Sequence, residues 1–204
     1  MLNFRKTPLP DVLDAFASSE PVPGGGSAGA LTGALGVSLL LMVAGMAKTR
    51  TNAPEEVADL AAAAARLRPI RDELAAIIEE DSQAYVDVLI ALKLPRETGE
   101  ESTTRRAAVA HAMRAATEVP LRTMRLCQEA LREAPMVATL GNPNAATDAA
   151  VGAKLLFAAL ESAGMNVDVN LPGVQDAEFV QLATEERQAL LAKAKASVNL
   201  VEHS

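Results

Sequence analysis

The chain has 204 residues, of which half are hydrophobic, only 2% are aromatic and none is tryptophan. A core of this composition must be built from Ala, Leu, Val, Ile and Met, which favours closely packed helices, and strand-like alternating runs are scarce. The sequence therefore predicts an all-α fold with a single domain over residues 1–204. The net charge of −7 argues against a nucleic-acid-binding protein, which needs a basic surface.

A short amphipathic helix is expected from Pro10 to about Ser18, and a loop rich in proline and glycine follows it. The loop reads Pro21-Val22-Pro23-Gly24-Gly25-Gly26-Ser27. Its prolines fix φ, whereas its glycines permit backbone conformations that residues with a Cβ avoid. Because the loop leads into a helix, free backbone N–H groups are expected to face one spot, where an anionic or polar ligand binds. Such loops also serve merely to turn the chain, so this segment alone leaves the function open.

The helix after this loop, beginning near Ala28, contains no charged residue before Lys48. The uncharged stretch Gly24–Ala47 is long enough to span a bilayer, so a membrane-anchored protein is one interpretation. Small residues at helical spacing, as in Gly29-x-x-x-Gly33, and the lack of Trp and Tyr belts favour a central helix buried on all sides. No secretory signal pattern opens the chain, so we expect a cytoplasmic protein without a membrane span.

Two long helices, each containing a proline, are expected next. Pro54 stands at a favoured first-turn position and begins a helix over about Pro54–Leu92, which Pro69 should kink or split. Thr98-Gly99-Glu100-Glu101 matches a capping box and opens a helix over about Glu100–Ala134. Pro120 lies inside this second helix and predicts another kink or break.

Two further helices complete the predicted bundle. Asn144 is expected to cap a helix over about Ala145–Val169, and Asp176 a terminal helix extending to about Val201. The predicted architecture is a bundle of long, kinked helices around a buried central helix.

Asp81 is the acidic residue whose position is most informative. Residues three and four apart share a helix face, which places Asp81 on an apolar stripe of the helix predicted over Pro54–Leu92. The stripe consists of Ile77, Ile78, Ala84, Tyr85 and Val88. A carboxylate on such a face loses hydration, and unless it is paired its pKa should rise toward the range useful for proton transfer. The alternative is an edge residue bonded to a neighbouring helix or to water.

A second polar group surrounds the turn that begins at Gly141. Asp148 falls among apolar residues, and Asn166 and Asn170 are four apart near a helix end, where their amides would face one ligand. The alternative for both asparagines is capping and turn formation, which the pattern alone favours.

Other kinds of site find little support. No cluster of Cys and His has metal-ligand spacing, so no metal is expected, and Cys127 lies in an apolar run typical of a buried residue. The glycine loop lacks the Gly-Lys-Ser/Thr ending of a nucleotide-binding loop. Lys48 and Arg50 are candidates for binding anionic ligand groups, with simple solvation as the alternative.

Several of these segments occur in an order that is typical of one family. They are Pro21–Ala28 with its apolar helix, Glu80–Tyr85, Lys93-Leu94-Pro95, Glu118-Val119-Pro120-Leu121, Gly141-Asn142 with Asp148, and Asn166–Leu171. By their order and spacing over nearly the whole chain, the sequence resembles the cyclodeaminase/cyclohydrolase family of folate enzymes.

The resemblance implies an all-helical homodimer that acts on tetrahydrofolate one-carbon adducts without a metal, with a formimidoyltransferase as a possible partner. It places the catalytic aspartate on Asp81. The family's substrate-binding positions fall on Gly24, Gly25, Gly26, Ser27, Asn142, Asp148, Asn166 and Asn170. Many relatives carry Gly-Lys-Lys after the central helix, where this chain reads Ala47-Lys48-Thr49-Arg50-Thr51, so Lys48 or Arg50 would take its place.

The first hypothesis is therefore an acid/base enzyme that interconverts 5,10-methenyltetrahydrofolate with an N-substituted adduct. It would be a formimidoyltetrahydrofolate cyclodeaminase or a methenyltetrahydrofolate cyclohydrolase. The second is a non-catalytic helical dimer that binds a folate or a partner protein. The sequence does not choose between water and ammonia chemistry.

Overall fold

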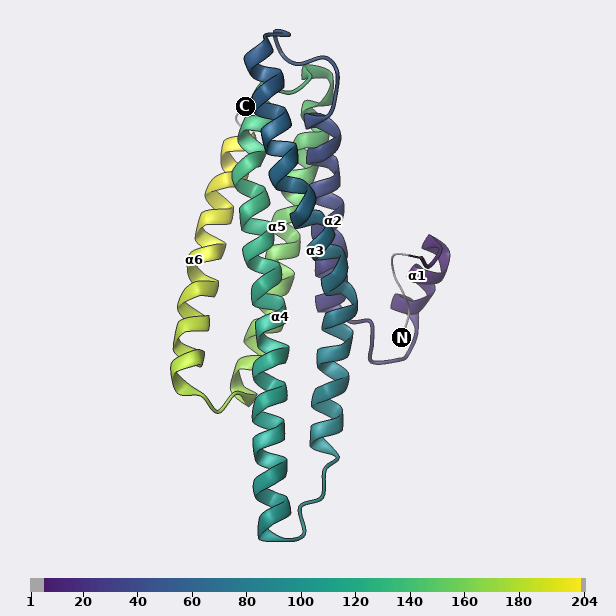
Figure 1. The fold of residues 1–204 in the computed structure, drawn as a ribbon, viewed down its shortest axis with the longest axis vertical. Helices are drawn as coiled ribbons and strands as arrows, with labels where there is room; N and C mark the ends of the chain where they lie inside the picture. Colours follow the sequence, from purple (N-terminus) through teal and green to yellow (C-terminus); the bar gives the residue numbers. More distant parts are fainter. Residues whose placement is uncertain (1–5, 203–204) are drawn as a thin grey trace.

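The computed structural model describes residues 6–202 and contains six α-helices and two short 3-10 helices in that part of the chain (Figure 1). The α-helices are α1 (Leu9–Ala17), α2 (Gly25–Ala44), α3 (Pro54–Leu92), α4 (Gly99–Leu140), α5 (Ala146–Asn170) and α6 (Ala177–Glu202). The 3-10 helices are η1 (Pro143–Ala145) and η2 (Leu171–Gly173). No strand occurs within residues 6–202, and the predicted all-α class is confirmed.

The long helices lie side by side along the long axis of the molecule (Figure 1). Helix α2 packs against α3 and α5, while α4 packs against α3, α5 and α6. Helix α1 lies off to one side, and the joined ends of α3 and α4 extend beyond the other helices as a two-helix arm. The main core is shared by α2 to α6, and a smaller apolar cluster within the α3–α4 pair contains Val88, Ala91, Ala112 and Ala116.

Small residues let α2 approach α5 closely, as their spacing predicts. A Cβ added to Gly36 would lie 2.8 Å from the carbonyl oxygen of Gly152, and one added to Gly29 would lie 3.5 Å from that of Ala159. Because α5 backbone occupies this space, a side chain at Gly36 would force the two helices apart.

Within the single chain, the burial of the central helix is incomplete on one face. Leu35 and Met42 of α2 are 55% and 42% exposed, because no described element covers that face. In length and apolar composition α2 would suit a membrane span, and 56% of its most apolar stretch is buried in the bundle.

Local signals predicted most helix ends. Pro54 begins α3, the capping box of Thr98 and Glu101 opens α4, and Asp176 Oδ1 accepts a hydrogen bond from Phe179 N–H at 3.0 Å. Two predictions need correction. Helix α4 continues through Pro135 to Leu140, because tertiary packing outweighs the missing N–H, and residue 145, not Asn144, occupies the N-cap position of α5.

Candidate active site

A cleft of about 380 Å³ opens where the start of α2 meets α3, α4 and the end of α5. Asp81 of α3 lies in its wall, together with glycines of the α2 start and both predicted asparagines of α5. The remaining lining residues are Pro21, Val22, Ala84, Tyr85, Val88, Met113, Ala116 and Val169. The cleft thus combines an apolar wall with a few polar groups, as small-molecule sites do.

The glycine segment differs from the predicted loop, because α2 already begins at Gly25. Gly25, Gly26 and Ser27 form its first turn, and no described glycine has positive φ, so conformational freedom does not explain them. The N-cap residue Gly24 has no side chain with which to bond the free N–H groups of this turn. An acceptor for these N–H groups therefore has to come from outside α2.

The carboxylate of Asp81, on the neighbouring helix α3, lies over this first turn of α2. Its Oδ2 accepts a hydrogen bond of 2.8 Å from the hydroxyl of Ser27, and the backbone N–H of Ser27 also bonds the carboxylate. A Cβ on Gly26 would lie only 2.1 Å from Asp81 Oδ1 and 2.7 Å from Cγ. Gly26 is therefore required because the carboxylate lies directly over its Cα.

The environment of Asp81 favours its protonated form. Desolvation by burial raises the pKa of Asp81 above its usual range, and the two bonds from Ser27 oppose this shift without cancelling it. The raised pKa that the apolar stripe predicts is confirmed. A carboxyl group that exchanges its proton nearer neutral pH is suited to act as a general acid and base.

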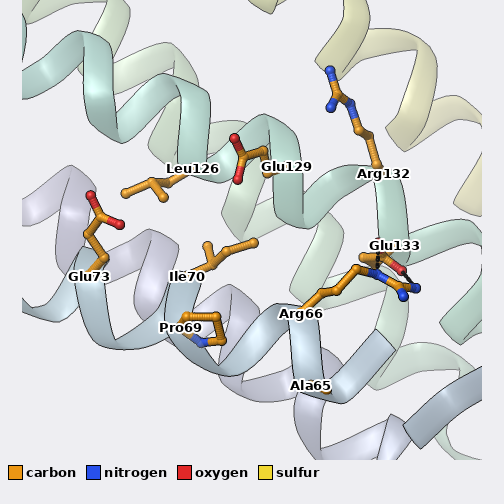
Figure 2. A pocket seen from close by; sticks show the side chains of 9 residues that line it. All are labelled: Ala65, Arg66, Pro69, Ile70, Glu73, Leu126, Glu129, Arg132 and Glu133. Carbon is orange, nitrogen blue, oxygen red and sulfur yellow. Dashed lines mark hydrogen bonds and ion pairs between the residues drawn. The ribbon is translucent and has the colours of Figure 1, made fainter. Parts of the chain in front are cut away.

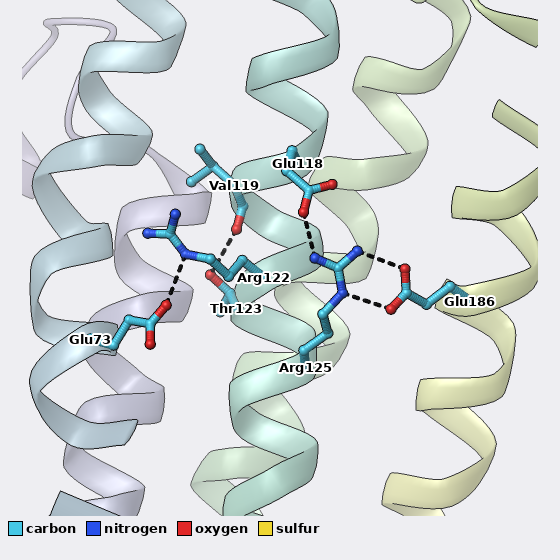
Figure 3. A network of polar contacts seen from close by, with 7 residues as sticks. All are labelled: Glu73, Glu118, Val119, Arg122, Thr123, Arg125 and Glu186. Atoms are coloured by element: carbon cyan, nitrogen blue, oxygen red, sulfur yellow. Dashed lines mark hydrogen bonds and ion pairs between the residues drawn. The ribbon is translucent and has the colours of Figure 1, made fainter. Parts of the chain in front are cut away.

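The nearby arginines do not pair with Asp81, since they form ion pairs elsewhere (Figure 3). Arg122 of α4 pairs with Glu80, the residue before Asp81, and with Glu73 at 3.2 Å. Arg125 bonds both carboxylate oxygens of Glu186 on α6 at 2.6 and 2.7 Å and also pairs with Glu118. These pairs tie α4 to α3 and α6, and within residues 6–202 no cation pairs with the Asp81 carboxylate to lower its pKa.

Both asparagines of α5 reach the cleft, but their amides also make structural bonds. Asn166 Nδ2 donates to the carbonyl oxygen of Ser162 at 2.9 Å, and Asn170 Nδ2 donates to that of Ala116 in α4 at 2.8 Å. Pro120 has no N–H to bond the Ala116 carbonyl within α4, and Asn170 supplies the missing donor. Each side-chain carbonyl oxygen remains available as an acceptor for a ligand.

Four of the predicted binding residues, Lys48, Arg50, Asn142 and Asp148, lie at the opposite end of the bundle. Asn166 follows Asp148 by 18 positions in α5, about 27 Å along the helix. Asn142 Oδ1 caps η1 by accepting from Asn144 N–H at 3.0 Å, and Arg50 Nε donates to the carbonyl oxygen of Thr139 at the end of α4 at 2.6 Å. Lys48 is exposed. Within one chain these residues and Asp81 do not form a single site.

Sequence reasoning singled out no residue of α4 for the site, yet Met113 and Ala116 of this helix line the cleft. Both are small or apolar residues in a helical pattern, and nothing in the local sequence distinguishes them from core residues. Only the packing of α4 against α3 and α5 brings them to Asp81.

A larger depression of about 600 Å³ lies between α3 and α4 on the outer surface (Figure 2). Its prominent feature is an ion pair in which Arg66 bonds both carboxylate oxygens of Glu133 at 2.8 Å. Arg66 is 54% exposed and Glu133 is 17% exposed, so this pair is partly solvated and links the two helices at the surface. The most buried acid of this depression, Glu133, is already paired with Arg66, whereas Asp81 has no such ion pair among the described residues, so the Asp81 cleft is the better candidate.

Comparison with known proteins points to one family. A family model described as formiminotransferase-cyclodeaminase matches residues 8–189. The methenyltetrahydrofolate cyclohydrolase of Methylorubrum extorquens is 39% identical over 90% of this chain and 88% of its own length. The formimidoyltransferase-cyclodeaminase of Gallus gallus is 31% identical over 95% of this chain, which spans about a third (36%) of that longer protein.

The fold has a counterpart among solved structures. The crystal structure of formiminotetrahydrofolate cyclodeaminase from Thermotoga maritima superposes with a TM-score of 0.87, covering 98% of this chain and 96% of the other. At 24% sequence identity, this likeness establishes the shared helical fold.

Proposed function

This chain belongs to the formiminotransferase-cyclodeaminase family, and from this premise we propose that it is a folate one-carbon enzyme that makes or breaks a C–N bond of a tetrahydrofolate adduct. The observation that carries the proposal is the desolvated carboxyl group of Asp81 in a cleft with polar and apolar walls. The cleft glycines and the two asparagines of α5 are the proposed substrate contacts within the chain.

In the cyclohydrolase direction, water adds to the amidinium carbon that bridges N5 and N10 of the folate. The Asp81 carboxylate takes a proton from the attacking water and returns it to the departing nitrogen as the C–N bond breaks. The remaining hydroxyl proton leaves to solvent as the formyl carbonyl forms. Before it takes up this proton, the negatively charged Asp81 carboxylate would also stabilise the cationic methenyl group.

In the cyclodeaminase direction, N10 attacks the formimidoyl carbon carried by N5. The formimidoyl nitrogen enters the reaction protonated, as an amidine is at neutral pH. Asp81 takes the proton of N10 and gives it to this nitrogen, which leaves as ammonia while the positive charge passes to the new methenyl bridge. The same residue serves both reactions because each moves one proton from a nucleophile to a leaving nitrogen.

Direct turnover of the two adducts tests the proposal. We expect the purified protein to hydrolyse 5,10-methenyltetrahydrofolate faster than it cyclises 5-formimidoyltetrahydrofolate, since the M. extorquens relative that matches over nearly its full length is named a cyclohydrolase. Release of ammonia and loss of the methenyl absorbance are the measurements. Binding of tetrahydrofolate adducts without turnover of either would instead favour the non-catalytic helical dimer.

We further propose that the exposed face of α2 and α5 joins two copies of the chain. Leu35 and Val151 are 55% and 42% exposed, and each precedes a glycine of the Gly36–Gly152 contact between the two helices. Met42 and Met165, at the two ends of this face, are also exposed. An apolar strip of this extent on paired helices is typical of an interface.

A two-fold axis across the long axis of the bundle would pair the helices in opposite directions. It would place the Lys48 and Asp148 end of one chain beside the Asp81 cleft of the other. Because Arg50 already bonds the end of α4, Lys48 is the better cation for the anionic glutamate tail of a folate. Asn142 and Asp148 would contribute polar groups to the same shared site.

Changing Leu35→Glu should separate the copies. Light scattering should give twice the 21.3 kDa chain mass for the unaltered protein and a single chain for the variant, because a buried carboxylate is costly at an interface. Turnover should decrease when the dimer dissociates, since each separated chain holds only part of the shared site. Leu182→Glu on α6, at a residue that is 57% exposed, is the control and should stay dimeric. A monomeric unaltered protein with full activity would contradict the proposal.

A further inference from the structure

The hydroxyl of Ser27 lies behind Asp81, away from the cleft that Asp81 lines. Ser27 is fully buried and its neighbour Ser82 is only 2% exposed, so neither is placed to touch a substrate. The Ser27 Oγ lies 2.8 Å from Asp81 Oδ2, 3.0 Å from the carbonyl oxygen of Ile78 and 3.1 Å from Ser82 Oγ. One hydroxyl proton is thus surrounded by three acceptors.

The number of protons and lone pairs on each hydroxyl decides which group donates in these contacts. A hydroxyl donates one proton and accepts through two lone pairs. The carboxylate is the strongest of the three acceptors because it is charged, so Ser27 donates to Asp81 Oδ2. The Ile78 carbonyl already accepts from the α3 backbone four residues later, and Ser82 is free to donate its proton to Ser27 Oγ. The result is a chain from Ser82 to Ser27 to Asp81 Oδ2.

The two oxygens of Asp81 are therefore not equivalent. Oδ2 is held from the buried side by a hydroxyl that a second hydroxyl orients. Among the described residues Oδ1 accepts no side-chain hydrogen bond, and it lies 2.1 Å from where a Cβ of the cleft residue Gly26 would be, closer than Oδ2 at 2.9 Å. The absence of a side chain at Gly26 leaves room for this oxygen at the surface where a substrate would bind.

We propose that Ser27 is a positioning residue that fixes which oxygen of Asp81 exchanges the proton, by holding Oδ2 from behind and leaving Oδ1 for the substrate. This inference rests on the proposed function and adds a division of roles within the carboxyl group. Ser27 can keep its donation to Oδ2 whether Oδ1 is ionised or protonated, so Asp81 changes its charge without changing its rotamer.

The groups around Asp81 allow the effect of the Ser27 hydroxyl to be separated from the effects of neighbouring charges. The α2 start contributes only neutral groups, and α5 contributes the amides of Asn166 and Asn170. From α4 come Met113 and Ala116, which do not ionise, and Arg122, which pairs with Glu80 and Glu73. On α3 itself the other ionisable residue of the cleft is Tyr85. Loss of the Ser27 hydroxyl thus removes a bond without altering a neighbouring charge.

Ser27→Ala tests the inference through rate and pH together. The value of kcat should fall by about 10²-fold, because the carboxyl group is free to rotate, while KM should change little. The limb of the pH–rate profile that reports Asp81 should move to higher pH, since the lost bond stabilised the ionised form. Ser82→Ala should shift the same limb in the same direction by less, because it removes only the donor that orients Ser27.

Two further measurements keep the outcome clear. Thr123→Val, which removes a buried hydroxyl of α4 outside the cleft, should leave the profile unchanged, and circular dichroism should show all three variants folded. Carbon-13 titration of the Asp81 carboxyl follows its ionisation without any substrate. An unchanged Asp81 titration in Ser27→Ala overturns the inference even if the enzyme is active. If the titration moves but the unaltered protein turns over neither adduct, the proposed function fails instead.

Discussion

Asp81→Asn is expected to reduce turnover of the folate adduct by about 10³-fold, the loss typical of removing a positioned general acid and base. The amide keeps the shape of the carboxyl group and still accepts a bond from Ser27, but it cannot take up or release the proton. The variant should remain folded and should bind the substrate with nearly unchanged affinity, so the loss falls on kcat.

The stability of the same variant follows from the raised pKa of Asp81. A carboxyl group with a higher pKa in the folded state favours folding most at low pH, and this contribution is lost as pH rises through the folded-state pKa. Burial therefore works against the ionised form of Asp81, a penalty that asparagine does not carry. We expect Asp81→Asn to melt at or above the temperature of the unaltered protein at pH 7.

Asp87→Asn is the matched control on α3. Asp87 is exposed and accepts a bond from Gln83 Nε2 at 2.7 Å, so its replacement should leave turnover within about twofold. Turnover of Asp81→Asn within tenfold of the unaltered rate would remove Asp81 from the mechanism.

Gly26→Ala is expected to lower turnover by about 10²-fold, although it adds only a methyl group. The new Cβ would lie 2.1 Å from Asp81 Oδ1, so the carboxyl group must rotate away and lose its bond to Ser27. Steady-state kinetics of the purified variant gives the measurement, with the melting temperature as a check on folding.

Gly25→Ala gives the steric comparison one residue earlier. Its Cβ would lie 3.7 Å from Asn166 Nδ2, an ordinary contact, so the rate should fall much less than in Gly26→Ala. Equal losses in both variants would mean that the helix start, rather than the contact with Asp81, determines the effect.

The parts of this molecule that the sequence predicts are those with local causes. Pro54, the capping box of Thr98 and Glu101, and Asp176 each act within one helical turn, so their helix ends agree with the structure. Asp81 belongs to this class too, because helical periodicity alone places it on an apolar face and thereby predicts the raised pKa.

What the sequence does not predict depends on contacts between distant segments. The three glycines indicate an unusual backbone, yet the need for Gly26 arises from a carboxylate 55 residues away in the sequence. The exposed face of α2 is not predicted for a similar reason. An apolar helix has the same sequence pattern whether it packs against its own chain or against another chain. Met113 carries no local mark of the cleft at all.

The bond from Asn170 to the carbonyl of Ala116 has an evolutionary consequence. While Pro120 is present, loss of Asn170 leaves a buried carbonyl oxygen without a donor, at a cost of about 1–3 kcal/mol. If Pro120 is replaced first, the N–H of the new residue can bond that carbonyl, and the Asn170 side chain is no longer needed as its donor. The two positions should therefore covary, and substitutions that pass through a stable intermediate must change the proline before the asparagine.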